Sequence, residues 1–284
     1  MIIVITGPTG VGKTKMSIEL AKKYNAIIVN ADAMQVYKGL NIGTAKIKEE
    51  EKENIEHLLF DIREVNEEYT VYDYQRDVRH ILEEYKDRNI ILVGGTGLYI
   101  KASLYDYRFK EESNKDIDYS NYTNQQLYEL CLQKDKNCNI HPNNRIRLER
   151  FLTKEDTSII EPKPLYNFTI IGLTTDRDTL YNRINNRVDI MLKEGLLEEV
   201  KYYYDNYRDA KSLKRGIGYK ELFNYFDKTS SLEECINKIK QNSRHYAKRQ
   251  YTFFNNQFNI KWFNVDFNNF NNTIKEVEEY IEKQ

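Results

Sequence analysis

The first fourteen residues constrain the fold of this 284-residue chain more than any other stretch. A short apolar run from Ile2 to Ile5 leads, after Thr6, into Gly7-Pro8-Thr9-Gly10-Val11-Gly12-Lys13-Thr14. These eight residues fit the pattern G-x-x-x-x-G-K-[ST], which lies between a strand and a helix in phosphate-binding loops. Apolar residues at helical spacing follow at Met16 and Leu20, so the flanking pattern agrees with the motif.

The residue types in this loop suit an anion. Glycines permit backbone angles that side chains forbid, so consecutive N–H groups turn inward on a bound phosphate. The helix expected to begin near Lys13 adds the positive end of its dipole. Lys13 supplies a mobile positive charge, and the Thr14 hydroxyl can reach a magnesium ion. ATP, GTP and a simple diphosphate ester present similar oxygens, so the loop leaves its ligand open.

The bulk properties favour a cytoplasmic α/β protein. Strand and helix patterns alternate along the chain, 31% of residues are charged, and the mean hydropathy is −0.74. No run approaches the ~20 apolar residues of a membrane span, and no signal peptide precedes the first strand. The net charge of −1 gives no global sign of nucleic-acid binding, which must come from local patches. Cys131, Cys138 and Cys235 lack metal-site spacing and are expected to be free thiols.

Two further buried strands end in polar or glycine-rich turns. The segment from Asn25 to Asp32 predicts a strand with Asp32 at its carboxyl end, and Asn89–Val93 predicts another, followed by Gly94–Gly97. Open α/β sheets bind ligands at that edge, so Asp32 and Thr96 are both candidates to face the phosphate-binding loop. A helix N-cap is the structural alternative for Asp32.

Composition changes after about Tyr105, where the chain becomes polar and poor in aliphatic residues. The predicted division is a catalytic core of residues 1–107 and 165–284 and an inserted helical domain of residues 108–164. A helix beginning near Arg145 carries Arg147 and Arg150, which are three positions apart and share a face. They could form a surface ladder with Glu149 or contact RNA phosphates.

The carboxyl-terminal part returns to the sheet and then becomes basic. Phe168–Leu173 predicts another buried strand, and a long amphipathic pattern with a break near Gly195 follows it. Asn237–Gln250 contains five cations and no acid, with aromatic residues just after it. This pattern is typical of an RNA-contacting helix, although a solvated surface helix would also fit.

With these pieces placed, the sequence resembles the tRNA dimethylallyltransferase (tRNA isopentenyltransferase) family over nearly its whole length. Seven blocks carry the resemblance: GPTGVGKT (7–14), DAMQVYKGLNIGTAK (32–46), LVGGTGLY (92–99), IHPNNRIRLER (140–150), NRVDIMLKEGLLEEV (186–200), GIGYKEL (216–222) and RHYAKRQ (244–250). Their number and order are more specific than the phosphate-binding loop alone.

The resemblance implies a P-loop NTPase-like core, with a parallel sheet flanked by helices, and a small inserted helical domain. It implies transfer of a dimethylallyl group from dimethylallyl diphosphate to N6 of the adenosine immediately 3′ of the anticodon (position 37), in tRNAs that read codons beginning with U. It also implies Mg²⁺ as cofactor, a tRNA anticodon loop as partner, no membrane, and a monomer.

The same resemblance assigns roles to individual residues. Asp32 is the expected general base on the adenine amine, and Thr96 is expected to hydrogen-bond near that amine or the diphosphate. The diphosphate or nucleotide is expected on Gly7, Pro8, Thr9, Gly10, Val11, Gly12, Lys13, Thr14 and Lys220, with Thr14 reaching the metal. Contacts to tRNA are expected from Asp32, Ala33, Met34, Gln35, Thr96, Ile146, Arg147, Leu148, Glu149, Arg150, Arg244, Lys248 and Arg249.

The chain departs from the family pattern at three positions. Ala33 stands where Ser is usual, Leu58 replaces the second His of a pair, and Lys220 replaces an Arg. Lys keeps the charge but loses a bidentate grip on phosphate. Two alternatives stay open: a prenyltransferase that acts on free adenine nucleotides, and a P-loop small-molecule kinase or nucleotide-gated RNA-binding module. The basic helices argue against the first of these.

Overall fold

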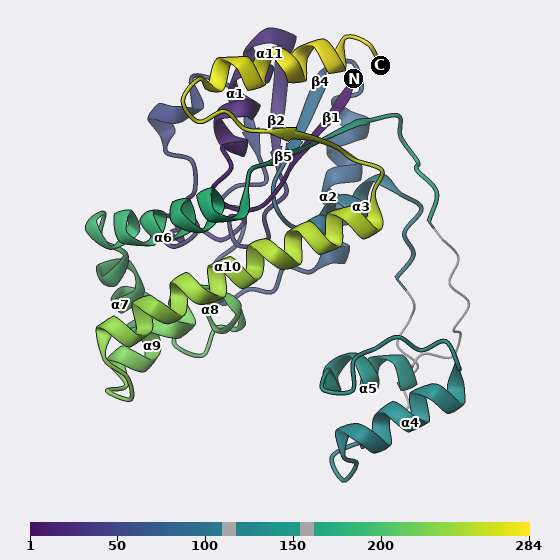
Figure 1. Cartoon of the computed structure of the whole chain (residues 1–284), viewed down its shortest axis with the longest axis vertical. Coiled ribbons are helices and arrows are strands. Elements are labelled where there is room, and N and C mark those ends of the chain that lie inside the picture. Colours follow the sequence, from purple (N-terminus) through teal and green to yellow (C-terminus); the bar gives the residue numbers. More distant parts are fainter. Residues whose placement is uncertain (110–117, 154–161) are drawn as a thin grey trace. The chain divides into compact units, whose positions relative to one another are not determined.

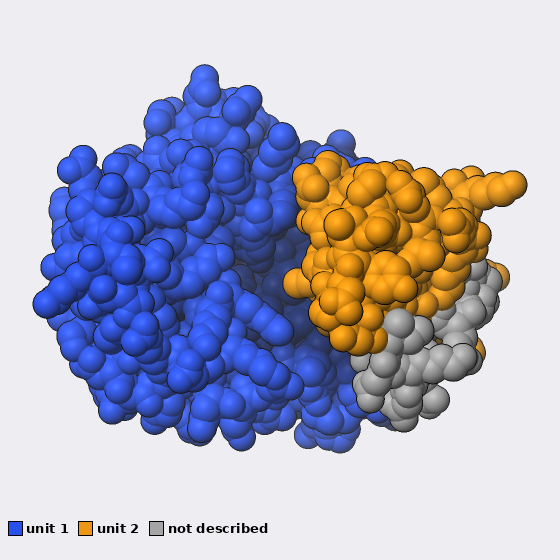
Figure 2. Space-filling view, turned by 90° about the horizontal axis from the view of Figure 1, so that it is seen from below, with its two compact units in different colours: residues 1–105, 164–284 blue, residues 106–163 orange. Residues whose placement is uncertain are grey.

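The computed structural model describes residues 1–109, 118–153 and 162–284. The chain divides into two compact units, Met1–Tyr105 with Pro164–Gln284, and Asp106–Lys163 (Figure 2). The domain boundaries predicted from composition lie within two residues of this division. Parts of the predicted inserted domain, residues 110–117 and 154–161, lie outside the described residues.

The larger unit contains a six-stranded sheet whose strand pairs are all parallel, in the order β3-β2-β4-β1-β5-β6 (Figure 1). The strands are β1 Ile2–Thr6, β2 Ala26–Asn30, β3 His57–Leu58, β4 Asn89–Val93, β5 Thr169–Thr174 and β6 Lys261–Asn264. Parallel sheets need both faces covered, which explains why β1, β2 and β4 are nearly continuous apolar runs. The predicted α/β class with a parallel sheet is confirmed.

Alternate residues of each strand enter two different cores, as the period of a strand requires. On β1, Ile3 and Ile5 pack with α1 (Lys13–Tyr24) and α11 (Phe270–Ile281), which lie against one another in Figure 1. Val4 points to the opposite core, which contains residues of α2 and α3. The cores are therefore built on the two faces of one sheet.

The remaining helices of the larger unit are α2 Val71–Glu84, α3 Gly97–Leu104, α6 Arg177–Lys193, α7 Leu196–Tyr207, α8 Lys211–Arg215, α9 Tyr219–Phe226 and α10 Leu232–Gln257. The basic segment predicted as a helix lies inside α10, which begins earlier and ends later than expected. Ser231 caps its first turn by accepting a hydrogen bond from the Glu234 amide at 3.2 Å. Within the ranges that the structure describes, no helix has both the length and the apolar character needed to cross a membrane.

The smaller unit packs α4 (Asn124–Lys134) against α5 (Arg145–Thr153) around a small apolar core. Leu148 is completely buried in that core, so its predicted contact with tRNA is wrong. Arg145 pairs with Glu149 at 2.7 Å, whereas Arg147 and Arg150 are exposed. The three cysteines are free thiols, as predicted, and all are buried.

The strand order determines where ligands can approach. The strands β2, β4 and β1 are neighbours, so their carboxyl ends lie side by side. The chain leaves β1 into the loop Gly7–Thr14, leaves β2 towards Asp32, and leaves β4 into Gly94–Gly97. A Cβ atom on Gly94 would overlap the carbonyl of Ala31, so these turns are packed against each other.

Candidate active site

A cavity of about 750 Å³ opens at these strand ends and is lined only by residues of the larger unit. Most of its lining comes from residues 9–14, 32–35 with 43–47, 183–196 on α6 and α7, 215–220, and 239–250 on α10. This size is typical of a small-molecule site. The predicted residues Lys13, Asp32 and Lys220 all line it.

The glycine loop, Gly7–Thr14, contributes five residues to the lining of the cavity and depends on close packing. A Cβ atom on Gly7 would overlap the Leu173 carbonyl oxygen, and the backbone there has φ +139°. Gln250 joins this loop to the turn after β4. Its Oε1 accepts from the Thr9 amide at 3.2 Å, and its Nε2 donates to the Gly95 carbonyl at 3.1 Å.

Three cations surround the glycine loop. Lys13 Nζ donates to the carbonyls of Gly7 (3.0 Å) and Pro8 (2.8 Å). From α6, Arg187 donates to Thr9 Oγ1 at 3.2 Å, and Arg183 donates to the Gly10 carbonyl at 2.8 Å. The sequence pattern did not identify these two arginines as site residues, although they are four positions apart and therefore share one helix face.

Burial and mutual repulsion act on the pKa values of these cations. Burial and, to a smaller extent, the nearby charge of Arg187 lower the pKa of Lys13 to about 8, while Asp32 opposes the shift. Burial also lowers the pKa of Arg187, again against the influence of Asp32. Within the described ranges, no carboxylate forms an ion pair with Lys13, Arg183 or Arg187. Such a group of cations beside inward-turned amides suits a multiply charged anion.

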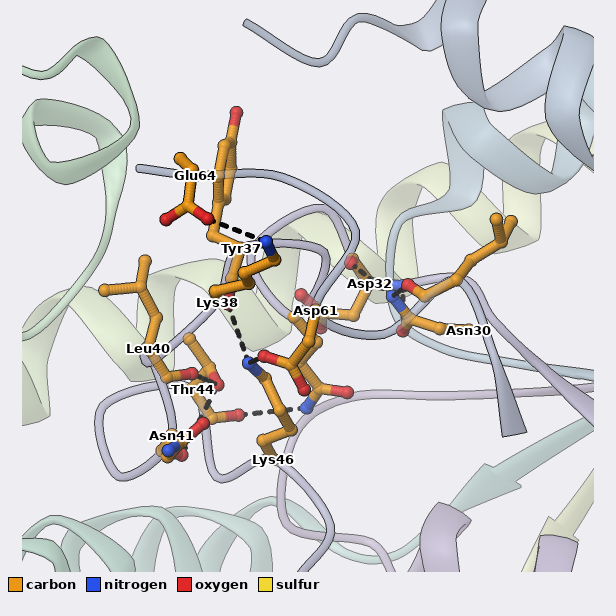
Figure 3. A network of polar contacts seen from close by, with 12 residues as sticks. Asn30, Asp32, Tyr37, Lys38, Leu40, Asn41, Thr44, Lys46, Asp61 and Glu64 are labelled. Atoms are coloured by element: carbon orange, nitrogen blue, oxygen red, sulfur yellow. Dashed lines mark hydrogen bonds and ion pairs between the residues drawn. The ribbon is translucent and has the colours of Figure 1, made fainter. Parts of the chain in front are cut away.

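Asp32 lines the same cavity, and the polar contacts around it are shown in Figure 3. Its Oδ1 accepts from the Met34 amide at 3.0 Å, and Asn30 holds its backbone by accepting from the Asp32 amide at 2.9 Å. Turns rather than a helix follow, so the helix-cap alternative is wrong. Oδ2 of Asp32 has no hydrogen bond to the residues that the structure describes, and it is therefore available to a ligand.

Thr96 lies behind Asp32. Its Oγ1 accepts from the Ala33 amide at 3.1 Å, and its own amide donates to the Ala31 carbonyl at 3.0 Å. It is not among the residues that line the cavity. Burial raises the pKa of Tyr246, while hydrogen bonds with Thr96 and Gln250 oppose that rise. Thr96 thus holds the Asp32 turn, and its predicted contact with substrate stays a prediction.

The segment after Asp32 is irregular and is held by polar contacts (Figure 3). Gln35 lines the cavity, and its Nε2 donates to the Thr44 carbonyl at 3.0 Å. Lys46 is buried and donates to the Tyr37 carbonyl at 2.7 Å and to Asp61 Oδ1 at 2.5 Å. Burial lowers the pKa of Lys46, whereas its bond to Asp61 opposes that shift.

Most of the other predicted cations are exposed. Lys220 is 41% exposed, and its ammonium lies 3.8 Å from Glu221. Lys248 and Arg249 are exposed on α10, and Arg249 also lines the cavity. Arg244 is partly buried and donates to Asn185 Oδ1 at 2.6 Å. Their predicted roles stay predictions.

The predicted metal ligand fits a magnesium ion held mainly by substrate oxygens. Thr14 is exposed at the start of α1 and lines the cavity, and its hydroxyl makes no hydrogen bond to described residues. The described ranges contain no group of three or more His, Cys, Asp or Glu side chains placed to hold a metal. Mg²⁺ is usually bound through few protein groups together with substrate phosphates, so a single hydroxyl beside a diphosphate site is compatible with it.

Comparison with known proteins supports one family. The model of the IPP transferase family matches residues 35–257. A tRNA dimethylallyltransferase of Anoxybacillus flavithermus is 45% identical over 299 residues, covering 99% of this chain and 96% of that protein; one of Fusobacterium nucleatum is 48% identical, covering 93% and 91%. The crystal structure of a tRNA isopentenylpyrophosphate transferase from Bacillus halodurans is similar with a TM-score of 0.78 at 39% identity, covering 99% of this chain and 95% of that one. A eukaryotic dimethylallyltransferase acting on tRNA gives a TM-score of 0.81 at 26% identity, covering 100% and 80%.

Proposed function

Because the chain belongs to the IPP transferase family and is a tRNA-prenylating enzyme, we propose that it joins the dimethylallyl group of dimethylallyl diphosphate to N6 of the adenosine immediately 3′ of the anticodon. One observation carries this proposal. Three cations with no acidic partner among the described residues lie in or beside the glycine loop, and they share a cavity with Oδ2 of Asp32. One side suits a leaving diphosphate, and the other suits an amine that must lose a proton.

The glycine loop and the cations next to it act on the leaving group. The N6 lone pair attacks the allylic carbon, the carbon–oxygen bond breaks, and diphosphate departs with the electron pair. Loop amides, Lys13 and Arg187 stabilise the charge that grows on the departing oxygens, which is an effective form of electrostatic catalysis. A magnesium ion held by Thr14 and the phosphates would add positive charge at the same place.

Asp32 acts on the nucleophile. The adenine amine is a poor nucleophile, so a carboxylate that takes its proton as the carbon–nitrogen bond forms speeds the step. The proton goes to Oδ2 of Asp32, the oxygen without a hydrogen bond to described residues. The adenine has to leave its stack to reach a cavity of this kind, which costs least in a single-stranded anticodon loop.

The exposed cations bind phosphates of the RNA backbone in this proposal. Lys248 and Arg249 on α10 and Arg147 and Arg150 on α5 are exposed, and such side chains position a protein on phosphates. The two alternatives, a kinase and an enzyme of free nucleotides, have no support among these relatives, whose names all specify tRNA.

The test is incubation with dimethylallyl diphosphate, Mg²⁺ and unmodified tRNA, followed by mass analysis of the nucleosides. We expect one dimethylallyl group on the adenosine 3′ of the anticodon, and competition by excess AMP should be weak. The matched control is the Asp32→Asn enzyme, which should bind tRNA and form little product. Absence of prenylated adenosine in every tRNA that reads codons beginning with U would refute the proposal.

A further inference from the structure

Glu199, on α7, is bound by an unusual set of donors. Its Oε2 accepts from the amides of Asn41 (3.0 Å) and Ile42 (2.8 Å), and its Oε1 accepts from the amide of Gly43 (2.9 Å). The hydroxyl of Tyr219 donates to Oε1 as well, at 2.6 Å. Three consecutive backbone amides thus converge on one carboxylate, an anion-binding arrangement in which the protein supplies its own anion.

The loop that Glu199 holds, residues 39–46, is also packed tightly against α7 and α9. A Cβ atom on Gly39, where φ is +71°, would overlap the Tyr203 hydroxyl oxygen. A Cβ atom on Gly43 would lie 2.7 Å from the Tyr219 ring. The loop has no regular secondary structure, so these contacts replace the ladder of hydrogen bonds that would fix a strand or a helix.

The far end of the same loop fixes a cavity residue. Gln35 Nε2 donates to the carbonyl of Thr44 at 3.0 Å and lies 3.5 Å from that of Ala45. Because these carbonyls hold its nitrogen, the amide oxygen of Gln35 has a defined direction, and it makes no hydrogen bond to described residues. Lys46, which ends the loop, is anchored separately by Asp61 and Tyr37 (Figure 3).

We propose that Glu199 is a positioning residue for the nucleic-acid substrate. Its carboxylate fixes residues 41–43, these fix the carbonyls of Thr44 and Ala45, and the carbonyls orient Gln35 in the wall of the cavity. The inference rests on the proposed function, in which residues 32–35 meet the target base. It adds that substrate recognition there depends on a carboxylate contributed from more than 150 positions away.

We call Glu199 and the four groups that donate to it, the amides of residues 41–43 and the Tyr219 hydroxyl, the clamp. Its chemistry requires a carboxylate. Four donors converge on Glu199, and a carboxylate offers acceptors on both oxygens. In Glu199→Gln one oxygen becomes an NH₂ group, which opposes the donors on that side. Glu199→Asp keeps the charge but is one methylene shorter, so it should restore part of the clamp. Glu198 is the neighbouring, exposed carboxylate and makes no hydrogen bond to described residues, so Glu198→Gln is the matched control.

The first measurement is amide hydrogen exchange of the full-length enzyme. In Glu199→Gln the amides of residues 41–43 should exchange at least ~10-fold faster, the lower end of what loss of a charge-assisted hydrogen bond produces. Amides in β1 and β4 should keep their protection, which separates loss of the clamp from global unfolding. Unchanged exchange at residues 41–43 would overturn the proposal.

The second measurement separates positioning from a structural role. In Glu199→Gln the KM for tRNA should rise ~10-fold or more, while the Kd for inorganic pyrophosphate stays within about twofold. Glu199→Asp should lie between the wild type and Glu199→Gln. Faster exchange with an unchanged KM for tRNA would show that the clamp is only structural and would overturn the proposal.

A third variant keeps the test decisive if Glu199→Gln fails to fold. Tyr219→Phe removes one donor to Glu199 and keeps the ring that packs on Gly43. It should change exchange and KM in the same direction by a smaller factor, and no change in either would overturn the proposal. A wild-type enzyme without transferase activity would refute the proposed function instead, and the exchange result on its own would still decide whether the clamp exists.

Discussion

The two walls of the cavity are built in different ways. The cationic wall consists of the glycine loop with Lys13, Arg183 and Arg187, and the acceptor wall consists of Asp32 and Gln35. Most of the cationic wall is one continuous segment between a strand and a helix, and its amides are oriented by the backbone itself. The acceptor wall lies in a segment without regular secondary structure, and its side chains are oriented by residues that are distant in sequence.

The shape of one wall therefore depends on residues close in sequence, whereas the shape of the other depends on long-range contacts. A loop whose ends are fixed by β1 and α1 needs few other contacts to keep its shape. The segment after Asp32 instead relies on Asn30, Thr96, Lys46 and Glu199. Substitutions in the two walls should therefore affect different groups in the reaction, the leaving diphosphate and the accepting amine.

The largest effect is expected in the acceptor wall, at Asp32. Asp32→Asn keeps the size and the bond to the Met34 amide but cannot take the amine proton. We expect kcat to fall ~10²–10⁴-fold, measured by rapid quench at saturating tRNA and dimethylallyl diphosphate. An equal loss of tRNA affinity with little change in kcat would assign Asp32 to substrate positioning.

The next effect is expected in the cationic wall, at Lys13. Lys13→Met removes a cation from the leaving diphosphate, and kcat/KM for dimethylallyl diphosphate should fall ~10²–10³-fold. The Kd for tRNA, measured by filter binding without the diphosphate, should stay close to the wild-type value. A variant with normal kcat/KM would exclude Lys13 from leaving-group stabilisation.

Arg187 should give a smaller effect of the same kind. Arg187→Met removes one charged hydrogen-bond donor beside the glycine loop, which should lower kcat/KM for dimethylallyl diphosphate by ~10–10²-fold. Lys193 is an exposed cation at the end of the same helix, so Lys193→Met is the control. It should change kcat/KM for dimethylallyl diphosphate by less than about twofold. Similar losses in both variants would mean that the effect is only long-range charge.

The pH dependence should follow the cationic wall. Lys13 has a pKa lowered to about 8 in the folded protein, so its protonated fraction falls as the pH rises through that value. Affinity for pyrophosphate should be highest below pH 8 and should decline above it, by at most about tenfold per pH unit. The same pH series with Lys13→Met reports how ionisation of pyrophosphate itself changes the affinity. An equal decline of affinity with pH in both proteins would contradict the assignment.

The smallest effect on catalysis is expected outside both walls, in the unit of residues 106–163. Arg147→Ala removes an exposed cation and should raise the KM for tRNA by ~2–5-fold without a change in melting temperature. Leu148→Ala opens the core of that unit and should destabilise it by ~2–5 kcal/mol, measured by denaturation. The reverse pattern would mean that Leu148, rather than Arg147, faces RNA.

The sequence was sufficient to predict most of the cationic wall, because the residues that form the glycine loop are contiguous in the chain. Glycine spacing, an apolar strand and a helical pattern identified the loop, and the ends of β2 and β4 located Asp32 beside it. The apolar runs of β1, β2 and β4 mark buried strands, whereas the parallel sheet is what the family resemblance implies. These signals depend on neighbours within a few residues, which a linear chain displays directly.

The remaining features depend on tertiary contacts. Arg187 lies in a helix whose pattern indicates an apolar face, and only packing shows that its side chain reaches Thr9. Leu148 lies in a block for which the resemblance implies tRNA contact, yet the fold of α5 on α4 buries it. Glu199 resembles any surface carboxylate until its partners at residues 41–43 are brought to it.

The central claim is that the cationic wall binds the diphosphate while Asp32 acts only on the amine. Calorimetric titration of inorganic pyrophosphate with Mg²⁺ into Lys13→Met and Asp32→Asn tests it directly. We predict that Lys13→Met loses ~10²-fold in affinity, while Asp32→Asn binds pyrophosphate as well as the wild type, or more tightly because a nearby negative charge is gone. Normal binding by Lys13→Met together with impaired binding by Asp32→Asn would contradict the account.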